Sequence, residues 1–149
     1  MKKKFLFLMA SLFFLFSVSF ANGNTNHIPS SIRSEFNHDF SYASNVNWES
    51  INGYYKVSFE DQGKTRYAFY TADAEFMGIA SYILSDNLPV SLQNELKENY
   101  MGYWITDLFH VYVNNEPAYF ITLQNADQKI MLRGEENRGW SYYSVEKKN

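Results

Sequence analysis

The sequence predicts an α+β fold: a tandem repeat of two units, each a helix followed by a four-stranded antiparallel sheet. The main observation is that two helix patterns with a leading proline, at Ile28-Pro29 and Leu88-Pro89, lie 60 residues apart. Aromatic-rich segments with alternating polar and apolar residues follow each helix pattern, and short turns separate them. Because an internal repeat indicates one structural unit used twice, we expect the two halves to share one architecture.

The first unit begins with an amphipathic helix and continues with strands. Ile32, Phe36 and Phe40 are spaced by four and predict one apolar helix face, between Pro29 and about Ser41. Alternating residues between turns then predict the strands of an antiparallel meander. The expected strands lie around Val46–Trp48, Tyr54–Phe59, Arg66–Tyr70 and Glu75–Leu84, with turns at Asn52-Gly53 and Asp61–Lys64.

The second unit repeats this order with extra residues after its helix. Tyr119 matches Tyr55 at an offset of 64 rather than 60, which predicts an insertion around Met101–His110. Asn114-Asn115 is the expected first hairpin turn of this unit. The apolar stripe of the second helix consists of Leu92, Leu96 and Tyr100.

The N-terminal segment has the features of a secretory signal peptide. Lysines at positions 2 to 4 precede an apolar run from Phe5 to Phe20, and Ala21 is a small residue suited to cleavage. The alternative is an uncleaved membrane anchor, although the run is shorter than the ~20 residues that span a bilayer. We expect cleavage after Ala21, and therefore a periplasmic or secreted protein without a membrane span. The expected organisation is a signal peptide at 1–21, a flexible leader at 22–27, and the two units at 28–84 and 85–149 in one compact domain.

Charge and cysteine content disfavour some classes of protein. The chain has 13 Lys and Arg against 16 Asp and Glu, and loss of residues 1–21 would leave 10 basic residues and a net charge of −6. An acidic protein is a poor ligand for nucleic acid, so we expect no nucleic-acid partner. The chain has no cysteine, so an exported form must rely on its core rather than on disulfides.

Several motifs resemble the PepSY-like family of small exported bacterial proteins. They are Ile28-Pro29 with its helix, Asn45-Val46-Asn47-Trp48, the run from Gly53 to Phe59, the Gly63-Lys64 turn, and Leu88-Pro89 with the second helix. The resemblance implies a fold like that of the β-lactamase inhibitor protein, in which the sheets form a concave face that grips a protein partner. It carries no catalytic residue, so it implies no reaction. The second half departs from the motif, because no Trp stands at the place of Trp48.

Residue patterns that carry catalysis or bind metals are sparse in the sequence. The lack of cysteine and of a Gly-x-Ser-x-Gly motif disfavours nucleophilic catalysis. No His-Glu-x-x-His motif or EF-hand loop is present either. We expect His38 on a solvated helix face, with its neighbour Asp39 pointing about 100° away from it, and the acidic segment Glu135–Asn137 in a solvated hairpin loop. We therefore expect no catalytic residue, no cofactor and no metal site.

Aromatic and basic side chains of the strands are the remaining functional signal. If Tyr55 and Val57 face the helix, the alternation of a strand turns Tyr54 and Lys56 to the other face. Tyr and Arg are common in interface hot spots, because they combine a large area with a polar group. The alternative is that the tyrosines are ordinary strand residues.

The next strand is expected to contribute to the same exposed face. If Tyr67 and Phe69 pack inward, Arg66 and Tyr70 point outward. A second group lies in the predicted loop at the insertion, where Trp104 could instead cover the core between the units. The candidate partner-binding residues are therefore Tyr54, Lys56, Arg66, Tyr70, Tyr103 and Trp104.

These observations predict an exported, non-enzymatic binding or inhibitor-like module that contacts a protein or an envelope ligand through an open sheet face. One alternative is a small envelope hydrolase with carboxylates in the cleft between the units. Another is a structural or stress protein without a specific ligand, which a smoothly polar sheet face would favour.

Overall fold

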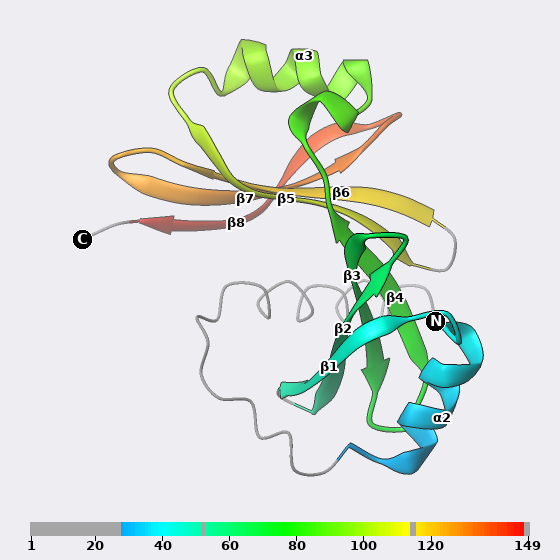
Figure 1. Cartoon of the computed structure of the whole chain (residues 1–149). Coiled ribbons are helices and arrows are strands. Elements are labelled where there is room, and N and C mark those ends of the chain that lie inside the picture. The colour runs from blue at the N-terminus through cyan, green and yellow to red at the C-terminus, as the bar shows by residue number, and fades with distance from the viewer. Residues whose placement is uncertain (1–27, 52, 114–115, 148–149) are drawn as a thin grey trace.

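The computed structural model describes residues 28–51, 53–113 and 116–147 (Figure 1). The predicted signal peptide at 1–21, the leader at 22–27, and the expected turn residues Asn52 and Asn114-Asn115 lie outside the described residues. Within the described ranges, no helix has both the length and the apolar character that a membrane crossing requires.

The described chain is an α+β fold with two α-helices and one antiparallel sheet of eight strands. The strands are hydrogen-bonded in sequence order, from β1 at one edge to β8 at the other. This confirms the predicted fold class and the antiparallel meander. The tandem repeat of two helix-plus-four-strand units, which was part of that prediction, stays a prediction. The elements are α2 (Ser30–Asp39), β1 (Ser44–Ile51), β2 (Tyr54–Asp61), β3 (Lys64–Thr71), β4 (Phe76–Tyr82), a 3₁₀ turn (Ser85–Asn87), α3 (Val90–Asn99), β5 (Trp104–Val113), β6 (Glu116–Gln124), β7 (Gln128–Glu135) and β8 (Gly139–Lys147).

The two helices begin and end in the same way. Each has ten residues and begins directly after a proline, Pro29 or Pro89, whose φ of −54° or −52° suits a helix start. Each ends where a backbone N–H, from Phe40 or Tyr100, closes the last turn on the carbonyl four residues earlier. The predicted helix positions are therefore confirmed, with the first ending at Asp39 rather than near Ser41.

Both helices cover the same type of surface, a sheet face rich in apolar residues. In Figure 1, α2 lies along the β1–β4 part of the sheet and α3 along the β5–β8 part. The core beneath α2 contains Ile32 and Phe36 of the helix with Val57, Phe59, Ala68 and Tyr70 of the sheet. The core beneath α3 contains Leu92 of the helix with Leu108, Ile121, Leu123, Ile130, Leu132 and Trp140 of the sheet.

A third core cluster lies on the sheet face that the helices do not cover. It includes Phe69 of β3, Phe109 of β5 and Phe120 of β6, each at most 2% exposed. Half-buried side chains from distant strands pack against it, among them Tyr54 of β2 and Tyr143 of β8. Strands near both edges contribute side chains to this one cluster, so the sheet curves around it. We call the buried residues of this cluster the apolar floor.

The alternation on β3 is opposite to the one that the sequence analysis assumed. Directly opposite residues of an antiparallel pair share a face, and Val57 pairs with Ala68. Because Val57 packs against α2, the even-numbered residues Ala68 and Tyr70 face the helix as well. Tyr67 and Phe69 consequently face the other side, so the predicted orientation of β3 was wrong.

Candidate partner-binding face

We call the sheet surface opposite α2 and α3 the open sheet face. Residues that pair directly across neighbouring strands point to the same side of the sheet. The strand register therefore identifies the side chains of this face. The pairs Tyr67 with Ala80, and Tyr82 with Phe109, place these side chains above the third core cluster. β4 pairs with β5, so this surface is continuous across the two halves of the chain.

An aromatic group lies at the centre of the open sheet face. The rings of Tyr82 and Phe109 are 3.9 Å apart between centroids, and the ring of Tyr67 contacts both, at 5.9 Å and 6.4 Å. Phe109 is buried, whereas the side chain of Tyr82 is 53% exposed. The group therefore has a buried phenylalanine below and a tyrosine surface that a partner can reach.

Charged side chains flank this aromatic group on the β1–β2 side. Lys56 Nζ lies 2.9 Å from Glu49 Oε2 and 5.6 Å from the centroid of the Tyr67 ring. The ammonium group is therefore held between a carboxylate and an aromatic face, a geometry that favours a cation. Since both contacts come from neighbouring strands, the position of Lys56 is set by the sheet.

The hydroxyls of Tyr67 and Tyr82 on the open sheet face stay protonated at neutral pH. Burial raises the pKa of Tyr82 to about 12, and the nearby Tyr67 and Asp107 act in the same direction. Burial, followed by the charge of Glu49, also raises the pKa of Tyr67. Each hydroxyl is consequently a neutral hydrogen-bond donor and acceptor, which suits recognition of polar groups rather than proton transfer.

The β6–β8 end of the open sheet face has a similar composition. Tyr143 packs edge-on against Phe120, with ring centroids 5.5 Å apart, and burial raises its pKa to about 12 although Arg133 acts in the opposite direction. Arg133 pairs with Phe120 across the strands, and its Nη2 lies 2.8 Å from Glu135 Oε1. Tyrosine and paired charge thus recur over the second half of the face.

The structure places three of the six sequence-predicted residues on the open sheet face. Two of them lie on β2: Tyr54 packs against the third core cluster, and Lys56 pairs with Phe69. Trp104 also belongs to this face by its pairing with Gln124, and its side chain is 51% exposed at the start of β5. Tyr103 instead packs against the core beneath α3, and its hydroxyl accepts a hydrogen bond from the side-chain amide of Gln128.

Arg66 and Tyr70 do not belong to the open sheet face, which corrects the predicted grouping. Tyr70 is completely buried in the core beneath α2. Arg66 pairs with Phe59 on that same side, and its Nε lies 2.8 Å from Asp61 Oδ2. The physical reason is the β2–β3 register described above, which turns even-numbered residues of β3 toward the helix.

Sequence reasoning missed Tyr67 and Tyr82, although one signal was available. A two-residue turn at Gln62-Gly63 pairs Asp61 with Lys64, and that register extends along both strands. Counting from this turn would have placed Tyr67 beside Ser58, opposite the helix. The position of Tyr82 had no such signal, because its strand partner lies beyond α3.

Comparisons with known proteins identify the fold. No family model matches the chain, and no curated protein matches it either. Solved structures do match. A DUF2874 family protein from Bacteroides ovatus ATCC 8483 has a TM-score of 0.70 at 16% identity, covering 82% of this chain and 89% of that one.

Two further solved structures come from the same bacterial genus. A proposed periplasmic protein from Bacteroides eggerthii DSM 20697 has a TM-score of 0.70 at 15% identity, with 82% and 90% of the two chains covered. A BLIP-like protein from Bacteroides fragilis NCTC 9343 has a TM-score of 0.68 at 18% identity, with 83% and 90% covered.

The fold is BLIP-like. This confirms the expected likeness to the β-lactamase inhibitor protein, because the match extends over most of both chains. None of these three structures is named as PepSY-like, so that narrower resemblance stays a prediction. At these identities the likeness concerns the fold, and the residues of the open sheet face must be argued from their own geometry.

Proposed function

We propose that this protein is an exported, non-enzymatic binding module that holds a protein partner on its open sheet face. The observation that carries the proposal is the exposed Tyr82, supported from below by buried Phe109 and from the side by Tyr67. A rigid aromatic side chain on a packed apolar floor is the kind of anchor that dominates protein interfaces.

The fold supports this proposal, because it is BLIP-like and one of its structural neighbours is a proposed periplasmic protein. We also propose a periplasmic or secreted location, with cleavage of the signal peptide after Ala21. The surface chemistry also fits a protein partner, since tyrosines with neutral hydroxyls combine apolar contact with hydrogen bonding. The charged pair of Lys56 and Glu49 then lies at the rim of the aromatic group.

The alternative of a hydrolase receives no comparable support. It requires two converging carboxylates, one of which acts as an acid. Glu49, Asp61 and Glu135 of the sheet are instead each paired with a basic side chain at 2.8 to 3.1 Å. The alternative of a structural protein predicts a smoothly polar surface, whereas Tyr82 exposes about half of an aromatic side chain.

The experiment compares two serine substitutions of exposed tyrosines on opposite faces. Tyr82 is 53% exposed on the open sheet face, and Tyr142 is 68% exposed on the α3 side of β8. Wild type, Tyr82→Ser and Tyr142→Ser, each shown by thermal melting to be folded, are used to capture partners from envelope extract. We expect a partner that wild type and Tyr142→Ser retain and that Tyr82→Ser loses. Equal capture by all three folded proteins would refute the assignment of this face.

A further inference from the structure

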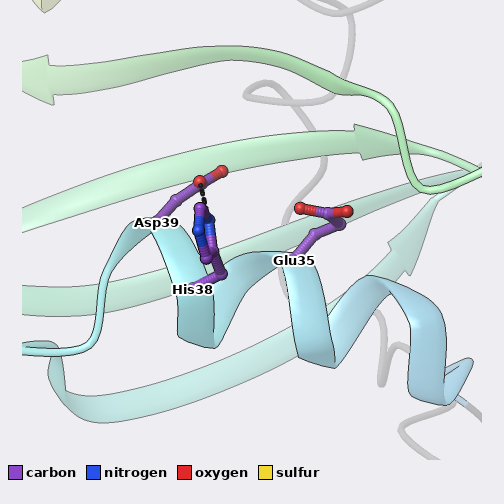
Figure 2. A group of neighbouring side chains, drawn as sticks. All are labelled: Glu35, His38 and Asp39. Carbon is purple, nitrogen blue, oxygen red and sulfur yellow. Dashed lines mark hydrogen bonds and ion pairs between the residues drawn. The ribbon is translucent and has the colours of Figure 1, made fainter.

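A cluster of three potential metal ligands lies on α2, away from the open sheet face. Glu35, His38 and Asp39 leave neighbouring turns of the helix, and their ligand atoms all lie within 4.8 Å of one another (Figure 2). His38 Nδ1 is 3.0 Å from Asp39 Oδ1. The spacing of three and four residues brings side chains onto one side of a helix, so the helix itself forms the cluster.

The three side chains are exposed, and they can adjust to a bound ion with little change elsewhere. Zinc places nitrogen and oxygen ligands about 2.0–2.2 Å from the ion. Rotation about the side-chain bonds of Glu35 and His38 can adjust the separations of the ligand atoms to such a sphere, because both side chains are exposed.

A second, independent observation comes from beneath the helix. Tyr70 of β3 is completely buried, and its hydroxyl has no hydrogen-bond partner among the described residues. Besides burial, which is the main cause, the charges of Asp39 and then Glu35 raise the pKa of this hydroxyl. Tyr70 belongs to the core beneath α2, the helix that carries both carboxylates. A buried hydroxyl without a hydrogen bond is costly, so an unpartnered polar group beneath this helix is unusual.

The other helix offers a useful contrast. Sixty residues further along, α3 has Glu95, Glu98 and Asn99 at the corresponding places. Glu95 is occupied, because its Oε2 accepts a hydrogen bond from the backbone N–H of Trp140 at 3.1 Å. An imidazole next to a carboxylate is therefore specific to α2. A general preference for charged residues on helix surfaces does not account for that difference.

We propose that Glu35, His38 and Asp39 bind one divalent transition-metal ion of the zinc or copper type. An imidazole combined with carboxylates suits these ions, whereas Mg²⁺ and Ca²⁺ select oxygen ligands alone. Three protein ligands leave a coordination position for water or for a group of a partner molecule.

The test uses isothermal titration of the tag-free protein, starting after residue 21, with ZnCl₂ and separately with MgCl₂. Wild type is expected to bind one Zn²⁺ per chain, more tightly at pH 7 than at pH 5, because a protonated imidazole cannot coordinate. His38→Ala is expected to weaken the binding at least about tenfold, as is Asp39→Asn. Glu98→Gln, at the place on α3 that corresponds to His38, is the matched control and should bind Zn²⁺ as wild type does.

Two results would overturn the proposal. One is equal Zn²⁺ affinity in wild type and in folded His38→Ala, as would follow if the ion bound elsewhere, for example at His27. The other is binding of Mg²⁺ with the same affinity as Zn²⁺, which would indicate attraction to negative charge alone. Neither result depends on the open sheet face, because α2 covers the opposite side of the sheet (Figure 1).

Discussion

Replacing Tyr70 by phenylalanine is the most direct test of how the first half of the protein is built. The ring of Tyr70 packs in the core beneath α2, 5.6 Å from the ring of Phe76 and 6.4 Å from that of Trp48 between centroids. Its hydroxyl is buried without a partner. The substitution Tyr70→Phe removes only this hydroxyl and keeps the ring contacts.

The expected change in stability is worked out from these two contributions. A buried hydroxyl without a hydrogen bond costs about 1–3 kcal/mol relative to one in water. Loss of the oxygen also leaves a void smaller than a methyl group, and the packing lost around this void offsets part of the stabilisation. We therefore expect Tyr70→Phe to raise the free energy of unfolding by about 1 kcal/mol, which corresponds to a rise of about 4 °C in Tm for a domain of this size.

The assay is urea and thermal denaturation in EDTA, so that no bound cation contributes. Tyr42→Phe is the matched control, because the side chain of Tyr42 is 59% exposed and its hydroxyl should stay hydrated. The control should change the free energy of unfolding by less than about 0.5 kcal/mol. If Tyr70→Phe lowered stability by about 1 kcal/mol or more, the hydroxyl would have to make a hydrogen bond in the folded protein, and the reasoning would be refuted.

Two substitutions and one titration test the second half of the fold. Trp140→Phe should lower the free energy of unfolding by about 2 kcal/mol in urea, because its indole N–H donates to the carbonyl of Leu92 at 3.0 Å and joins β8 to α3. Gly134→Ala should cost about 1–3 kcal/mol, since a Cβ there would lie 2.7 Å from the ring of Trp140, and should cost less in a Trp140→Phe background. Burial lowers the pKa of His110, so its NMR titration midpoint should fall below 6.5. The stability that its neutral form contributes is present above pH 6.5 and is lost as the pH falls through the lower folded pKa.

The sequence was sufficient for the elements and their order, because those depend on local signals. Pro29 and Pro89 with apolar residues every four positions predicted both helices. The alternation of Tyr54 to Phe59 predicted β2. These patterns act within one element, so they need no knowledge of the neighbouring strand.

The face of β3 was predicted wrongly because it depends on register rather than on alternation. Its segment from Arg66 to Tyr70 is apolar at both odd and even positions, so either face is compatible with a core. Only the pairing of Asp61 with Lys64 at the turn decides between them. As a result, Tyr70 was predicted at an interface and lies in the core.

The aromatic group of the open sheet face lay beyond sequence reasoning for a different reason. Tyr82 and Phe109 are direct partners on β4 and β5, and α3 with its flanking turns lies between them in the sequence. No short turn sets that register, so it follows from the packing of the two halves against each other. The cluster on α2 could have been predicted from the sequence, because Glu35, His38 and Asp39 have the spacing of residues on one side of a helix.

Folding and binding share residues on the open sheet face, and this determines which experiments can separate them. Phe69, Phe109 and Phe120 are buried there although neither helix covers them, because Tyr54 and Tyr143 reach over them from strands near both edges. Substituting a phenylalanine of this floor would therefore unfold the sheet and abolish any interaction indirectly. Tyr82 differs, because about half of it is already in water, and its removal disturbs the floor only where its ring covers Phe109. A loss of partner binding in Tyr82→Ser at unchanged Tm would consequently report on the surface itself, whereas the same loss in a floor variant would not.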